Sequence, residues 1–132
     1  MKNPNRLPLI GIFLLAAFMI VSGCKKKSDD PVTPSFTVTS STVILTTGGE
    51  GLQFFAKCTN IDVTMEKVSI TTPSSAVIIH DFKGTSFTKN ELFPMQDTFA
   101  AYGKEAGTWK FNLAGTAGGS AFAIDVTLSV SK

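Results

Sequence analysis

The side chains that could carry chemistry are few in this chain of 132 residues. It has two cysteines, Cys24 and Cys58, and His80 is its single histidine. Metal sites usually combine several His, Cys, Asp and Glu ligands, and the pair His80-Asp81 does not supply such a set. No serine stands in the Gly-x-Ser-x-Gly pattern that presents a catalytic nucleophile. The sequence therefore predicts no metal, no cofactor and no catalytic residue.

Acidic residues gather around one irregular part of the chain, at Asp81, Glu91, Asp97 and Glu105. Two carboxylates facing each other across a cleft can hydrolyse glycosides, and a Ser-His-Asp arrangement is assembled in space rather than in sequence. A hydrolase therefore stays an alternative. Solvated loop charges and a surface His80 at the end of a strand explain these residues more simply, and we predict that the protein is not an enzyme.

Cys24 stands at a sharp boundary in composition. Lys2 and Arg6 precede an almost wholly apolar run, Leu7 to Val21, and Lys25 begins a charged run. A helix that crosses a membrane needs about 20 apolar residues. A shorter apolar run behind a basic start is typical of a secretory signal peptide.

The stretch Val21-Ser22-Gly23-Cys24 resembles the lipobox of bacterial lipoproteins, although Val21 replaces the leucine that the family prefers. In that family the cysteine thiol receives a diacylglycerol, the leader is cut directly before it, and the new amine is usually acylated. The resemblance implies that residues 1–23 are removed, that Val21, Ser22 and Gly23 are recognised by the signal peptidase, and that Cys24 is lipidated. Several acyl chains, at about 0.8 kcal/mol per buried methylene, would anchor the protein to a membrane.

The next residues, Lys27-Ser28-Asp29-Asp30, resemble the export signal of Bacteroidota lipoproteins. The resemblance implies an outer-membrane lipoprotein of a Gram-negative bacterium, displayed on the cell surface. The same residues also fit a plain solvated tether, and the periplasmic face stays open as an alternative. Pro31 and Pro34 continue an extended linker. We expect residues 24–34 to be a lipidated, disordered tether and residues 35–132 to form the folded domain.

Removal of the leader changes the charge of the protein. Lys2 and Arg6 leave with it, so ten lysines balance ten acids in the remaining 109 residues. Nucleic-acid binders usually carry a basic face, and none is expected here. A chain of this length fits one domain and can bury a core without disulfides. Cys58 is then unpaired and is expected to be a small buried hydrophobe, with a reactive thiol as the alternative.

Hydrophobic alternation dominates the last part of the chain. Apolar residues at every second position of Phe122–Val130 and of Trp109–Leu113 predict two strands, with a loop of about six residues, Gly115–Ser120, between them. Their apolar stripes must share one face. Earlier strands are expected near 36–39, 43–45, 52–58, 63–70, 76–82 and 85–92, with a break at Ser40-Ser41 and a bulge near Glu66-Lys67.

Residues 93–107 are expected to form a long crossover loop or a short helical turn. The many short strands predict an all-β sandwich or barrel. Gly107-Thr108-Trp109 opening the penultimate strand, followed by an alternating last strand, is similar to bacterial immunoglobulin-like domains. The resemblance implies an immunoglobulin-like Greek-key β-sandwich of about seven strands, without the paired cysteines of antibody domains.

Aromatic residues offer one candidate recognition surface. Phe55 is expected to face outward on its strand, and Phe87, Phe93 and Tyr102 lie in the irregular part of the chain. They could form a ligand face for a sugar or a protein, or they could close one end of the core. We predict a non-enzymatic binding or structural module with an unknown protein or glycan partner. The alternatives are a glycan-capturing or ligand-capturing accessory of an outer-membrane uptake system, or an inhibitor of a secreted hydrolase.

Overall fold

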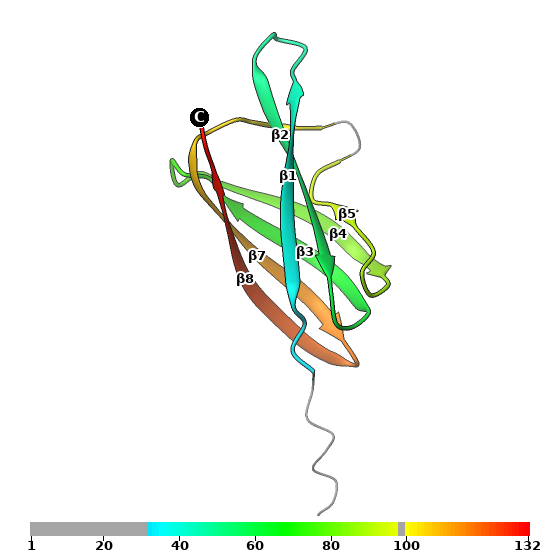
Figure 1. Cartoon of the computed structure of the whole chain (residues 1–132). Helices are drawn as coiled ribbons and strands as arrows, with labels where there is room; N and C mark the ends of the chain where they lie inside the picture. The colour runs from blue at the N-terminus through cyan, green and yellow to red at the C-terminus, as the bar shows by residue number, and fades with distance from the viewer. Residues whose placement is uncertain (1–31, 98–99) are drawn as a thin grey trace, which may run out of the picture. The chain divides into compact units, whose positions relative to one another are not determined.

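The computed structural model describes residues 32–97 and 100–132, which form two antiparallel sheets packed face to face (Figure 1). Its eight strands are β1 (Phe36–Ile44), β2 (Glu50–Cys58), β3 (Val63–Thr71), β4 (Val77–Phe87), β5 (Phe93–Pro94), β6 (Tyr102–Gly103), β7 (Gly107–Ala117) and β8 (Ser120–Val130). The described ranges contain no helix, and hence none that could cross a membrane.

The order of the strands confirms the predicted sandwich. One sheet runs β1-β2-β5, with β6 also paired to β2, and the other runs β4-β3-β7-β8. An immunoglobulin sandwich places strands A, B, E and D in one sheet and strands C, F and G in the other, with C′ beside C in some members. The present order is similar to that Greek-key plan, with β5 and β6 both at the E position beside β2 and no described strand at the D position. The eight strands replace the seven or so that were predicted.

The core lies between the two sheets and is built from strand positions of period two. Alternate residues of β2 point into it, from Leu52 through Phe54 and Ala56 to Cys58, and each is at most 1% exposed. Phe54 is at the centre, because its ring centroid lies 4.9 Å from that of Trp109 and 5.0 Å from that of Phe111. Burying such a side chain contributes about 1.5–3 kcal/mol, so these stripes hold the sheets together.

The last hairpin has the predicted shared face but a shorter turn. Trp109 pairs with Leu128, and Phe111 pairs with Val126. The turn is only Gly118-Gly119, whose positive φ angles of 58° and 83° suit a two-residue turn that follows the twist of the strands. The predicted six-residue loop is therefore wrong, because the segment Gly115–Ala117 belongs to β7.

A bulge in β3 confirms another prediction, since the register shifts between Met65 and Lys67. The partner strand β4 accommodates it with Lys83 and Gly84, which have φ angles of 56° and 72°. Beyond them β4 continues to Phe87. The separate strand predicted at 85–92 is wrong, because its first part completes β4.

The expected break in the first strand needs correction. β1 runs without a break through Ser40-Ser41, since both residues pair with β2 and their hydroxyl side chains are exposed to solvent at the edge of the sheet. The segment 93–107 was expected to be a long crossover loop or a short helical turn, and residues 98–99 of it lie outside the described part of the chain. Backbone pairing of β5 and β6 with β2 holds this segment at two points.

Asn60 fixes the place where the chain enters the sandwich. Its Oδ1 accepts hydrogen bonds from the Ser35 amide at 3.0 Å and the Cys58 thiol at 3.2 Å. Its Nδ2 donates to the Thr33 carbonyl at 2.9 Å. The ordered chain therefore already includes Thr33, and Pro34 is buried. Entry lies at the end of the sandwich that carries the β2–β3 and β7–β8 turns (Figure 1).

Candidate functional site

The residues of the lipobox-like stretch and the export signal lie outside the described part of the chain. They are Val21, Ser22, Gly23, Cys24, Lys27, Ser28, Asp29 and Asp30. The prediction of a lipid anchor stays a prediction. The site is therefore sought on the described surface, at two of its hollows and at one strand edge.

The predicted aromatic residues are placed in three different surroundings. Phe93 is buried and stacks on the half-buried Phe87, with ring centroids 4.2 Å apart. Tyr102 stacks on Phe54 in the core at 6.0 Å, and its hydroxyl donates to the Met95 carbonyl at 2.8 Å. Phe55 is half-buried on the other face of β2. The structure thus brings Phe87 and Phe93 together and places Phe55 and Tyr102 elsewhere.

A hollow of about 310 Å³, here called the β4–β5 cleft, opens beside Phe87. It is lined by His80, Asp81, Phe82, Thr85, Phe87, Pro94, Gln96 and Asp97. Phe82 packs edge-on against Phe87 at 6.0 Å and Phe93 at 5.6 Å, which gives the cleft a rigid aromatic wall. Its lining is mixed, with three apolar residues beside five polar ones, of which two are carboxylates.

His80 and Asp97 face each other at this cleft. Their Nδ1 and Oδ1 atoms are 3.7 Å apart, which is too long for a hydrogen bond. The His80 side chain is 17% exposed and Asp97 is 91% exposed. The hydroxyl of Thr85 donates to the Phe82 carbonyl and is thereby engaged. The arrangement favours electrostatic attraction of a ligand over nucleophilic chemistry.

Gln96 lines the β4–β5 cleft. It was not identified as a site residue from the sequence. It is 4% exposed, and its Oε1 accepts a hydrogen bond from the Phe54 amide at 2.8 Å. The Met95 amide donates to the Phe54 carbonyl at 2.9 Å. The chain after β5 is therefore fixed to β2. The only signal in the sequence was an amide directly after the apolar run Phe93–Met95.

Tyr102 should titrate unusually. Burial raises the pKa of its hydroxyl above the ordinary 10.0, and the negative charge of Asp97 raises that pKa further. A raised pKa favours the neutral, folded form, so this contribution to stability is present below pH 10 and is lost as pH rises through the folded-state value. We expect the free energy of unfolding to fall above pH 10, and ultraviolet absorbance of tyrosinate to appear late. Tyr102→Phe should remove the tyrosinate signal and this part of the pH dependence; an ordinary titration near pH 10 would contradict the buried placement.

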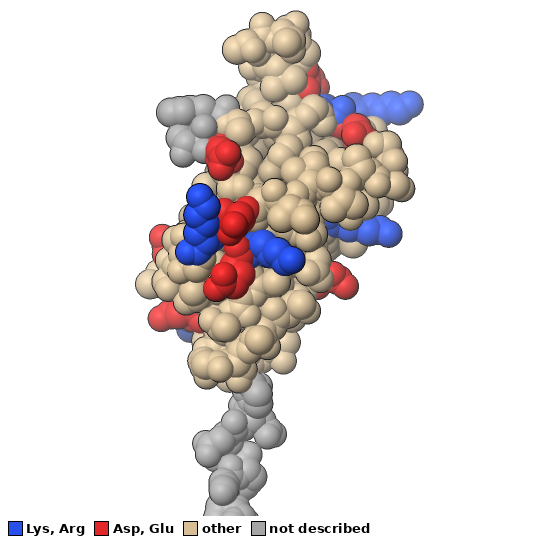
Figure 2. All heavy atoms as spheres, turned by 180° about the vertical axis from the view of Figure 1, so that it is seen from behind, with Lys and Arg blue, Asp and Glu red and all other residues tan. Residues whose placement is uncertain are grey.

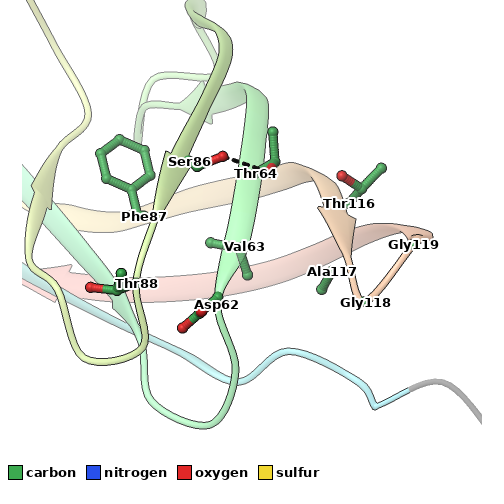
Figure 3. Close-up of a pocket in the computed structure, with 10 residues that line it drawn as sticks. All are labelled: Asp62, Val63, Thr64, Ser86, Phe87, Thr88, Thr116, Ala117, Gly118 and Gly119. Carbon is green, nitrogen blue, oxygen red and sulfur yellow. Dashed lines mark hydrogen bonds between the residues drawn. The ribbon is translucent and has the colours of Figure 1, made fainter.

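A second hollow, of about 340 Å³, lies near the end where the chain enters (Figure 3). We call it the hydroxyl groove. It is lined by Asp62, Val63, Thr64, Ser86, Phe87, Thr88, Thr116, Ala117, Gly118 and Gly119. The hydroxyls of Thr64 and Ser86 are hydrogen bonded at 2.9 Å, and the Phe87 ring points away from that pair. Hydroxyls and one carboxylate, with no aromatic platform, therefore define this groove.

The structure shows no reactive surroundings for Cys58 and no cluster of metal ligands among the described residues. Cys58 is buried, as predicted for a small hydrophobe, and its thiol is hydrogen bonded to Asn60. Among residues 32–97 and 100–132, no group of three or more His, Cys, Asp and Glu side chains could hold a metal ion.

Seen from the side opposite to Figure 1, much of the surface is uncharged, and several charges of both signs gather in one region (Figure 2).

Comparisons with models of protein families, with characterised proteins and with solved structures gave no match to this chain.

Proposed function

We propose that this protein is a lipid-anchored, non-enzymatic binding module of the bacterial outer membrane, displayed at the cell surface. The leader and the lipobox-like stretch support the anchor. The observation that carries the proposal is the clamp at Asn60, which fixes the entering chain to one end of the sandwich through Thr33 and Ser35.

This geometry suits display. Eight residues separate Cys24 from Thr33, and an extended chain spans at most about 3.6 Å per residue. A lipid on Cys24 would therefore hold the entry end within about 30 Å of the membrane. The β4–β5 cleft lies on the side of the sandwich, where a partner could reach it.

Replacing the proposed lipid acceptor gives a direct test. Cys24→Ala should abolish incorporation of labelled palmitate and remove the protein from the outer-membrane fraction, because no other residue can accept the diacylglycerol. Cys58→Ala is the matched control, and it should be labelled and fractionated like the wild type. Equal labelling of Cys24→Ala and wild type would refute the anchor.

A glycan-capturing accessory is a second candidate, favoured by the hydroxyl groove. Hydroxyls and a carboxylate are the groups that hydrogen bond sugar hydroxyls, and Thr116 is exposed in the groove. Neutral oligosaccharides at millimolar concentration should shift the amide resonances of Thr116, Gly118 and Gly119, and Thr116→Val should weaken those shifts several-fold. Unchanged resonances with a broad panel of neutral oligosaccharides would eliminate this candidate.

A further inference from the structure

The sheet β4-β3-β7-β8 ends in β4 at one edge. Among the described residues β4 pairs only with β3, as β8 at the other edge pairs only with β7. At the connecting turn the Thr72 amide donates to the Ala76 carbonyl at 2.9 Å, and the Ala76 amide donates to the Thr72 hydroxyl at 3.1 Å, so these two residues are at a hydrogen-bonded position of the ladder. Such pairs alternate along an antiparallel ladder with pairs that are not hydrogen bonded.

The alternation identifies the backbone groups that are left free. Counting from the turn, Ile78 and His80 bond to β3, while the amides and carbonyls of Val77, Ile79 and Asp81 point away from it. Six backbone groups along a five-residue stretch, about 17 Å long, therefore face outward. They form a template for another extended chain.

The side chains of this edge are also unusual. Val77 is 63% exposed and Ile79 is 61% exposed, and they supply two of the five exposed large hydrophobic residues of the described chain. Natural edge strands are usually protected by charged side chains, especially lysine, by proline or by a bulge. In β4 the bulge at Lys83-Gly84 comes later, so the stretch Val77–Asp81, here called the open edge, has only Asp81, at its end, as a charged side chain.

The open edge leads into the β4–β5 cleft. Asp81 belongs to both, and Asp97 borders the cleft on the other side. The lining contains these two carboxylates and no lysine or arginine. Lys67 is opposite Asp81 on β3 and Lys83 follows it, but the described residues form no ion pair between either lysine and the two aspartates. The cleft therefore has charge complementary to a cation.

Gln96 adds an independent pointer to an occupant. Its Oε1 is engaged by the Phe54 amide, which fixes the orientation of the side-chain amide. Its Nε2 makes no hydrogen bond with the described residues, and the residue is 4% exposed and lines the cleft. Buried polar groups usually have a hydrogen-bond partner. A carbonyl of an extended peptide in the cleft would be an acceptor for this amide.

We propose that β4 is a docking edge for an extended peptide segment of a partner protein, which adds a strand to the sheet and places a lysine or arginine in the β4–β5 cleft. The backbone groups of the open edge supply the hydrogen bonds. Val77 and Ile79 contact β-branched side chains of the added strand, and Asp81 and Asp97 attract its cation. A second copy of the open edge would bring no lysine or arginine of its own to the cleft, because residues 77–81 contain none.

The proposal names the partner of the binding module proposed above, and it does not depend on the lipid anchor. It can be tested with the full chain in detergent micelles, while palmitate labelling tests the anchor separately. Two synthetic peptides serve as probes: Arg-Thr-Val-Thr-Val-Thr-Arg and the same sequence with glutamate replacing both arginines. Binding is followed through the amide resonances of Val77, Ile79 and Asp81.

The arginine peptide should shift these three resonances and bind about five-fold more tightly than the glutamate peptide, the scale of one exposed ion pair. The double variant Asp81→Asn, Asp97→Asn should erase that preference. Ile79→Lys should weaken binding of the arginine peptide several-fold, whereas Ile44→Lys, at a position on β1 that is 73% exposed against 61% for Ile79, should leave it unchanged. An unchanged Trp109 indole resonance shows that each variant is folded.

Three outcomes would overturn the proposal. The first is the absence of shifts at Val77, Ile79 and Asp81 with millimolar arginine peptide. The second is equal affinity for the two peptides. The third is a shift of the same resonances with protein concentration alone, which would assign the open edge to a second copy of the chain.

Discussion

Trp109→Ala is expected to lower the free energy of unfolding by about 3–5 kcal/mol. The indole is fully buried and lies 4.9 Å from the ring of Phe54 between the two sheets. Truncation would leave a cavity lined by both sheets. The cavity would persist, because neither sheet can move in to fill it without breaking hydrogen bonds between its strands. It would also remove the hydrogen bond that the indole Nε1 donates to the Glu105 carbonyl at 2.9 Å.

Urea unfolding of the variant and of Thr108→Ala measures this effect. Thr108 is the exposed neighbour on the same strand, and its replacement should change the free energy of unfolding by less than about 0.5 kcal/mol. A loss below about 1 kcal/mol for Trp109→Ala, well under the range for buried aromatic residues, would show that the indole is not part of the core.

Gly115→Ala should be as damaging, for a different reason. An added Cβ would overlap the carbonyl oxygen of Thr64 and approach the Cα of Met65 to 3.1 Å. Both are backbone atoms of β3 next to its bulge, so they cannot rotate aside as a side chain would. We expect a loss of at least about 3 kcal/mol, the upper end for overpacked sites.

The matched control is Gly49→Ala, in the β1–β2 turn. An added Cβ there meets nothing within 4 Å, and stability should change by less than about 0.5 kcal/mol. Circular dichroism during urea unfolding compares the two variants. Equal stability of Gly115→Ala and Gly49→Ala would contradict the close approach of β3 and β7.

Local alternation predicted much of this sandwich. The stripes of Trp109–Leu113 and Phe122–Val130 are visible in sequence because each strand has one face in the core. The bulge between Met65 and Lys67 was visible as a change of phase. The turn was predicted to be too long because Gly115 was counted in it. Gly115 is a glycine because β3 packs closely against it, and only Gly118-Gly119 forms the turn.

The candidate site could be predicted only in part. Phe87 and Phe93 are six positions apart in the sequence, so their proximity in space could be expected. Gln96 acquires its role from a backbone amide 42 positions away, and Asn60 from an amide 25 positions away. The openness of β4 depends on its place at the end of the order β4-β3-β7-β8. Alternation assigns the faces of a strand, but it does not say which strands end a sheet.

The entry point and the proposed docking edge lie in different parts of the fold. Residues 33–35 are held near the β2–β3 turn by Asn60, and the open edge begins next to the β3–β4 turn. Those two turns are at opposite ends of β3. An anchored domain would therefore present the start of the open edge away from its tether.

The intact mass of the protein extracted from its native membrane tests the proposed anchor most directly. We predict a chain that begins at Cys24 and carries the added mass of a diacylglycerol and of an amide-linked acyl chain. A chain that begins at Met1, or one cut at another position and free of lipid, would contradict the proposal that this sandwich is a lipid-anchored module.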